Sequence, residues 1–146
     1  MQHLVHLNKD RKLKKIIAVQ PVYALQKKNN VYLHLCSSII SQQLSVKVAD
    51  VIYKRFLNLY PTQKPSPQQI VSTELEVLRS VGLSNAKANY VQNVCRFFID
   101  EKITDAKLHK MENEELISYL TRIKGVGQWT VEMILMFTLG REDVFA

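Results

Sequence analysis

Residues 120–135 read LTRIKGVGQWTVEMIL, and the interpretation of the whole chain starts from this stretch. An apolar pattern of helical spacing stops at Gly125 and Gly127, and a second pattern of the same kind begins directly after them. Because glycine adopts positive φ at little cost, we expect both glycines to help the chain reverse within about four residues. The stretch therefore predicts two helices joined by a tight turn, a helix-hairpin-helix at about residues 114–138.

Such a turn is suited to holding an anion. The first N–H groups of a helix have no partner within it, so a helix that starts at Gln128 presents free donors and a partial positive charge. Without Cβ atoms on the turn a phosphate can approach these donors, and Lys124 adds a full charge beside them. We expect Val126 to point inward, and the apolar residues that pack the two helices together are Leu120, Ile123, Val131, Ile134 and Leu135. The alternative is a glycine C-cap followed by an ordinary short connection.

The composition favours a polyanionic partner without identifying it. The 146 residues include 20 lysines and arginines against 13 acidic residues, which gives a formal net charge of +7. Many basic proteins bind no nucleic acid, so the charge alone does not select DNA or RNA. Cys36 and Cys95 lie in apolar runs and have the spacing of neither a zinc site nor a redox pair, so both are predicted to be core residues.

The periodicity predicts an all-α fold of about eight helices in one domain covering residues 1–146. We expect a helix at residues 11–19 and a central, buried helix that starts at residues 29–30. Ser45 is a candidate N-cap for a helix at residues 46–60, and Thr73 with Glu76 has the spacing of a capping box. No apolar run approaches the roughly 18 residues of a membrane span and no signal-peptide core is present, so we expect a soluble intracellular protein.

The pattern I-x-G-V-G-x-W-T-x-E-x-I at residues 123–134 closely resembles the hairpin of the helix-hairpin-helix base-excision DNA glycosylases, in their 3-methyladenine DNA glycosylase II branch. Two more blocks, IISQQLS at residues 39–45 and GLSNAK at residues 82–87, resemble segments of the same family in the same order. The resemblance covers about residues 10–146. It implies a multi-helix glycosylase domain that flips alkylated purines out of duplex DNA and releases them by hydrolysis.

The resemblance also implies positions for DNA contacts. It places the family's wedge residue, which enters the base stack where a base has been flipped out, at Gln43, two positions before Ser45. On spacing alone this corner is only a polar helix end followed by an N-cap. Lys87 lies in the first turn of a predicted helix, where a phosphate would meet both its charge and the helix dipole. The candidate DNA-binding residues are Gly125, Gly127, Lys124, Gln128, Gln42, Gln43, Ser45 and Lys87.

Trp129 bears on the chemistry. Glycosylases of this superfamily that also cleave the strand have a nucleophilic lysine two residues after the second hairpin glycine, and this chain has Trp129 there. The resemblance therefore implies a monofunctional enzyme without lyase activity. Trp129 and Met133 are assigned to the base pocket, because a π-face attracts the positive charge of an alkylated purine. On sequence alone, a buried structural tryptophan is an equal alternative.

The family's catalytic aspartate normally follows a D-V-F segment by several residues, and DVF stands at residues 143–145. The expected aspartate, with the last helices of the family's fold, would thus lie beyond Ala146, and no catalytic residue is assigned within the chain. By family register Asp143 belongs to the lead-in segment. Two interpretations stay open: a glycosylase whose 146-residue stretch lacks the catalytic group, and a non-catalytic hairpin module that binds DNA. A basic protein-interaction domain would leave G-V-G-Q-W unexplained.

The resemblance implies no cofactor other than a monovalent cation, K⁺ or Na⁺, held by the backbone carbonyls of Thr121, Ile123 and Val126. An unoccupied helix end is the alternative. The expected partner is double-stranded DNA with a damaged base. We expect the protein to bind it as a monomer and to have no membrane partner. Such a protein would work at the nucleoid in the cytoplasm of a prokaryote, or in the nucleus of a eukaryote.

Overall fold

The computed structural model describes residues 2–20 and 25–144, and this part of the chain contains ten helices and no strand. The all-α prediction is confirmed. The helices are α1 (Gln2–Leu7), α2 (Arg11–Val19), α3 (Val31–Ser41), α4 (Val46–Asn58), α5 (Pro67–Ser72), α6 (Leu75–Ser80), α7 (Asn85–Asp100), α8 (Asp105–Lys110), α9 (Asn113–Leu120) and α10 (Gln128–Phe137). Within these described ranges, no helix combines the length and the apolar composition needed to span a bilayer.

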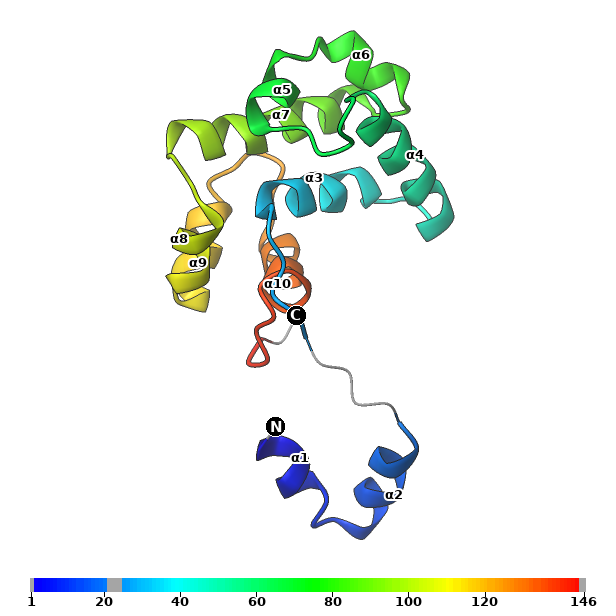
Figure 1. The fold of residues 1–146 in the computed structure, drawn as a ribbon, viewed down its shortest axis with the longest axis vertical. Helices are drawn as coiled ribbons and strands as arrows, with labels where there is room; N and C mark the ends of the chain where they lie inside the picture. The colour runs from blue at the N-terminus through cyan, green and yellow to red at the C-terminus, as the bar shows by residue number, and fades with distance from the viewer. Residues whose placement is uncertain (1, 21–24, 145–146) are drawn as a thin grey trace.

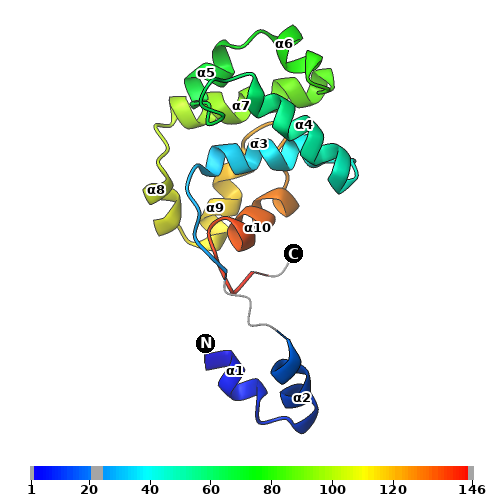
Figure 2. The same ribbon diagram turned by 45° about the vertical axis from the view of Figure 1, so that its right-hand side comes forward.

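Helices α3 and α7 form the centre of the core. They pack side by side, α7 also packs against α5 and α6, and α3 also contacts α4 and α10 (Figures 1 and 2). Tyr32 at the start of α3 meets Phe98 near the end of α7, with ring centroids 6.0 Å apart, so the two helices run in opposite directions. Cys36 and Cys95 are both buried on this pair of helices, as predicted.

The start of α3 is capped from a distant part of the chain. Asn30 lies in the left-handed region with φ 61° and its side chain caps nothing. Instead, the carboxylate of Asp105, the first residue of α8, accepts the N–H of Asn30 at 2.6 Å and that of Val31 at 3.1 Å. The cap therefore also ties the start of α8 to the start of α3.

Local capping agrees with the sequence at some helices and differs at one. Asp10 caps α2, which has the predicted bounds, and Ser45 caps α4 by accepting the N–H of Val48 at 3.4 Å. The capping box predicted for Thr73 and Glu76 is wrong, because the hydroxyl of Thr73 donates to the Gln69 carbonyl at 2.8 Å. A capping box does form one helix earlier, between Ser66 and Gln69 at the start of α5.

Helix α1 forms although the sequence around it shows no helical periodicity of apolar residues. In both views α1 and α2 are drawn apart from the other helices (Figures 1 and 2). The basic helix α2 has an apolar stripe, but none of its residues is buried, and Ile16 is 55% exposed. The stripe of α2 therefore does not contribute to the core formed by α3 and α7.

Candidate nucleic-acid interface

The predicted helix-hairpin-helix consists of α9, a tight turn and α10. The residues expected to pack the two arms together are all buried, together with Val126 in the turn: Leu120, Ile123, Val131, Ile134 and Leu135. The hairpin is thus held by apolar contacts on its inner side, and its turn is free to carry polar function.

The two hairpin glycines have different roles. Gly125 has φ +104°, and a Cβ there would collide with the ring of Tyr90 from α7. Gly127 has φ −95° and ψ 168°, so the prediction that both glycines adopt positive φ is wrong for Gly127. A Cβ on Gly127 would meet no atom within 4 Å. The fold needs glycine at position 125, whereas nothing in the folded hairpin requires it at position 127.

Gly127 leaves the start of α10 open. It is the N-cap of α10 and caps it with no side chain, and the first α-helical bond runs from the N–H of Val131 to the Gly127 carbonyl at 3.2 Å. Gly127, Gln128 and Trp129 are exposed, as is Lys124 before the turn. The first N–H groups of α10 therefore face solvent with a positive helix end behind them, which is the arrangement that binds phosphate.

Helix α7 supports the hairpin turn from the other side. The ring of Tyr90 packs against Gly125, and the side-chain amide of Asn93 donates to the Lys124 carbonyl at 3.4 Å. A polar hollow of about 400 Å³ lies beside the turn and is lined by Ala86, Asn89, Tyr90, Asn93 and Lys124. The hairpin turn is thereby positioned against α7 as well as against its own two arms.

A second exposed turn connects α3 to α4, and we call its four residues, Ser41 to Leu44, the glutamine turn. Gln42 has φ −51° and ψ 132°, Gln43 has φ 58°, and the N–H of Leu44 donates to the Ser41 carbonyl at 3.1 Å. These values describe a type II turn with Gln43 at the position that favours glycine. Gln42 is half-buried, whereas Gln43 is exposed.

Lys87 contacts the glutamine turn. Its Nζ donates to the carbonyl of Ile40 at 2.8 Å and to that of Gln42 at 2.6 Å, and its burial lowers the pKa of the ammonium group. Sequence reasoning did not find this contact, because it joins α7 to the end of α3 through the packing of the core. The phosphate contact predicted for Lys87 stays a prediction beside this observed role.

Trp129 is 60% exposed, so the alternative of a buried structural tryptophan is wrong. One turn further along α10 lies Met133, half-buried, and another turn on lies Phe137, which is 52% exposed. The side-chain amide of Gln128 donates to the Glu132 carboxylate at 2.8 Å. An apolar strip thus runs along α10 directly from the open helix start.

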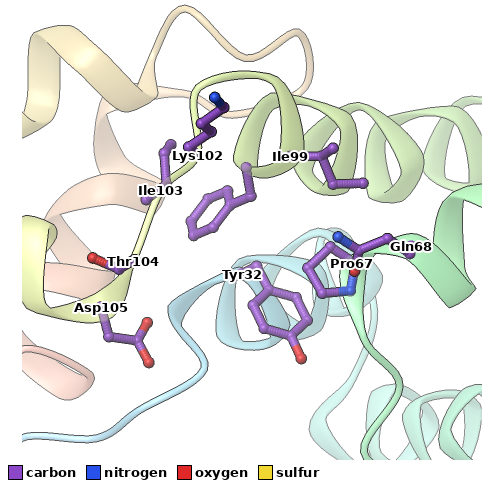
Figure 3. A pocket seen from close by; sticks show the side chains of 9 residues that line it. Tyr32, Pro67, Gln68, Ile99, Lys102, Ile103, Thr104 and Asp105 are labelled. Atoms are coloured by element: carbon purple, nitrogen blue, oxygen red, sulfur yellow. The ribbon is translucent and has the colours of Figure 1, made fainter.

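The hollow shown in Figure 3 lies elsewhere. It has a volume of about 480 Å³ and is lined by residues that include Tyr32, Phe98 and Asp105, at the start of α3 and the end of α7. The glutamine turn lies at the opposite end of the 11-residue helix α3, about 16 Å away. Neither this hollow nor the one beside the hairpin includes Trp129 or Met133, so the base pocket stays a prediction.

The predicted cation ligands lie in the hairpin turn. The Ile123 carbonyl accepts the N–H of Val126 at 3.0 Å, and since a carbonyl oxygen has two lone pairs, one remains available. The turn is therefore compatible with a bound monovalent cation, and this cation site stays a prediction. Among the described residues, no group of three or more His, Cys, Asp or Glu side chains could hold a metal ion. Asp143 is exposed.

Comparison with known proteins identifies one family and relatives whose names agree with it. Residues 36–146 match the sequence model of the HhH-GPD superfamily base excision DNA repair proteins. DNA-3-methyladenine glycosylase 1 of Schizosaccharomyces pombe is 36% identical, and the match covers 97% of this chain and 64% of that protein. A putative DNA-3-methyladenine glycosylase of Bacillus subtilis is 32% identical over 80% of this chain and 42% of its own length. The chain thus spans less than two thirds of these two curated relatives.

Solved structures agree with the sequence matches. The 3-methyladenine DNA glycosylase of S. pombe in complex with abasic DNA superposes with a TM-score of 0.83 at 33% identity, covering 99% of this chain and 73% of that one. A DNA-3-methyladenine glycosidase from Bacillus halodurans also gives a TM-score of 0.83, at 37% identity, covering 96% of this chain and 64% of that one. The hairpin and the glutamine turn therefore belong to a fold that solved relatives share.

Proposed function

Because this chain belongs to the HhH-GPD superfamily of base excision DNA repair proteins, we propose that it is the DNA-binding part of a DNA glycosylase that releases alkylated purines of the 3-methyladenine type from duplex DNA. The observation that carries the proposal is the open start of α10 at Gly127, where the fold leaves space and unpaired N–H groups. A DNA phosphate supplies the anion that fits there, and Lys124 is close enough in sequence to add charge.

The glutamine turn supplies the wedge. Gln43 is exposed on a tight turn, and the neighbouring Val46 is 88% exposed, so an apolar side chain lies beside it at the surface. A base can leave the stack only if its place is filled or its neighbours unstack, so a side chain entering the gap stabilises the flipped state. In this proposal Gln43 enters the duplex while the hairpin holds the backbone.

Trp129 lies where the flipped base would be received. Its exposed indole presents a π-face, and attraction between such a face and a cationic purine is worth about 0.5–2 kcal/mol. It also takes the position of the lysine of the strand-cleaving enzymes, so we propose hydrolysis by water without lyase activity. We assign the water-activating role to the aspartate that follows the D-V-F segment in the family, and the activity to a protein that carries this aspartate.

The proposed cation site lies in the same hairpin. Backbone carbonyls of Thr121, Ile123 and Val126 would hold K⁺ or Na⁺, which supplies positive charge next to a bound phosphate. Exchange of both ions for a bulky organic cation at equal ionic strength should then weaken DNA binding by this chain. Equal binding in the two buffers would remove the cation from the proposal.

A non-catalytic DNA-binding module is the second candidate, favoured because the open start of α10 at Gly127 and the exposed Lys124 can bind phosphate without any catalytic group. The deciding experiment uses duplexes that are undamaged, abasic or methylated, and measures both affinity and free methylated base. A glycosylase part is expected to prefer the abasic over the undamaged duplex, and the preference should depend on Gln43. Equal affinity for both duplexes without base release supports the module. Failure to bind any duplex rejects both candidates.

A further inference from the structure

The glutamine turn has a conformation that its sequence does not favour. The second central position of a type II turn requires positive φ, and glycine or asparagine is normally found there. Gln43 occupies it with φ 58°, one of the few residues other than glycine with positive φ in the described part of the chain. For an L-residue with a long side chain this conformation is unfavourable, so it persists only where surrounding contacts impose it.

One peptide group decides between the two common turn types. Types I and II differ by a reversal of the peptide that joins the two central residues, here Gln42 and Gln43. In the type I form Gln43 would have negative φ, which a glutamine prefers, and its side chain would leave in another direction. The orientation of the Gln42 carbonyl is therefore the switch between the two forms.

Lys87 holds this carbonyl. Its Nζ donates to the Gln42 oxygen at 2.6 Å, and a second bond to the Ile40 oxygen at 2.8 Å fixes the ammonium against the end of α3. A reversed peptide would turn the Gln42 oxygen away and leave that donor without its partner, part-buried. A charged donor against the carbonyls at a helix C-terminus is also favoured by the helix dipole.

We infer that Lys87 is a positioning residue for the wedge: by binding the Gln42 carbonyl it holds the glutamine turn in the type II form and directs Gln43 toward the DNA stack. This inference rests on the proposed function, because Gln43 must act as the wedge for its direction to matter. It differs from a phosphate contact, in which the same ammonium would touch DNA and no other protein group.

The first test concerns the turn itself. In a type II turn the Hα of Gln42 lies close to the N–H of Gln43 because ψ of Gln42 is near 132°, so NMR should show a strong NOE between them. Lys87→Met removes the donor and keeps an unbranched side chain, and is expected to weaken this NOE strongly. Lys110→Met removes a charge from the end of α8 and should leave it unchanged. A full-strength NOE in folded Lys87→Met overturns the inference.

The second test measures binding of undamaged and abasic duplexes by the 146-residue chain over a range of salt concentrations. Lys87→Met should reduce the preference for the abasic duplex by about 5- to 30-fold, as Gln43→Ala should, and combining both changes should cause no further loss. Its salt slope should equal that of the wild type. Lys124→Met is a control for a phosphate contact. It should lower the affinity for both duplexes alike and reduce the salt slope by about 1.

The outcomes separate the inference from the proposed function. If Gln43→Ala leaves the preference of the wild type intact, the wedge is wrong and the proposed function loses its support. If Gln43→Ala abolishes the preference while Lys87→Met retains it, or if Lys87→Met lowers the salt slope as Lys124→Met does, only the inference fails. Should Lys87→Met not fold, Lys87→Ala replaces it, because its side chain also has neither a donor nor a charge.

Discussion

Lys87 and Tyr90 lie one turn apart on α7, and each holds one of the two exposed turns: Lys87 binds the carbonyl of Gln42, and the ring of Tyr90 packs against Gly125. Residues three apart on a helix are neighbours on its surface. The glutamine turn and the hairpin turn are therefore both anchored to the same short stretch of α7, which sets their separation.

The first prediction concerns Gly127. Replacing it with alanine adds a methyl group that meets no protein atom within 4 Å, so the free energy of unfolding should change by no more than about 0.5 kcal/mol. DNA affinity should fall by about tenfold or more, because the methyl group lies where a phosphate approaches the open start of α10 and a charge-assisted hydrogen bond is worth about 1.5–3 kcal/mol. Denaturant unfolding and fluorescence anisotropy measure the two quantities.

Gly125→Ala is the matched control for this prediction. It has φ +104° and its Cβ would collide with Tyr90, so it should lower stability by at least about 1–3 kcal/mol. The two hairpin glycines should therefore differ: Gly127→Ala mainly lowers DNA affinity, whereas Gly125→Ala mainly lowers stability. Unchanged DNA affinity in folded Gly127→Ala would contradict the phosphate site.

The second prediction concerns the distant cap of α3. Asp105→Ala removes the acceptor for the N–H groups of Asn30 and Val31 and should lower the free energy of unfolding by about 1–2 kcal/mol. This loss corresponds to a melting temperature that is lower by about 3–8 °C. Asp105→Asn keeps one acceptor oxygen and should lose less. Because the cap is at the far end of α3 from the glutamine turn, DNA affinity at temperatures well below melting should not change. An equal loss in both variants would point to the charge of Asp105 and not to its hydrogen bonds.

How far the sequence predicts this structure differs between local and distant features. The bounds of α2, the start of α10 and the burial of Val126 follow from periodicity and capping chemistry within a few residues. The cap by Asp105 and the bonds of Lys87 could not be predicted, because each joins residues that only the folded core brings together. The Thr73 capping box fails for a local reason, because the hydroxyl of Thr73 bonds the carbonyl of Gln69 four residues earlier in α5.

The site shows the same division. The tight turn and the open helix start after it were predictable, because glycines and a helix start act through the local backbone. The different conformations of Gly125 and Gly127 were not, since they depend on Tyr90 from α7. The exposure of Trp129 was also open on sequence alone, because an indole in an apolar run fits a core and a binding surface equally well.

The third prediction is a steep salt dependence. If the hairpin and nearby lysines bind DNA through phosphates, the logarithm of the association constant should fall linearly with the logarithm of salt concentration, with a slope of about −0.9 for each phosphate neutralised. Affinity for undamaged duplexes should depend little on base sequence, because phosphate contacts carry no sequence information. Titrations of two unrelated duplexes at several salt concentrations test both statements. A flat response would mean that binding does not use the phosphates.

The last prediction concerns Trp129. Because its side chain is 60% exposed, Trp129→Ala should change the free energy of unfolding by no more than about 0.5 kcal/mol. It should lower the preference for a duplex with a stable cationic purine analogue over an undamaged duplex by about 2- to 30-fold, the range that corresponds to a cation–π attraction of about 0.5–2 kcal/mol.

Two variants make this result specific. Trp129→Phe keeps a π-face with a weaker quadrupole and should retain part of the preference. Phe137→Ala removes a comparably exposed aromatic side chain two turns further along α10, so it controls for the loss of apolar surface in general. The preference should then decrease in the order wild type, Trp129→Phe, Trp129→Ala. In Trp129→Ala, the duplex with an uncharged analogue of the same shape should lose less affinity than the duplex with the cationic analogue. Equal losses would mean that apolar contact explains the role of Trp129, and that attraction between its ring and the charge does not.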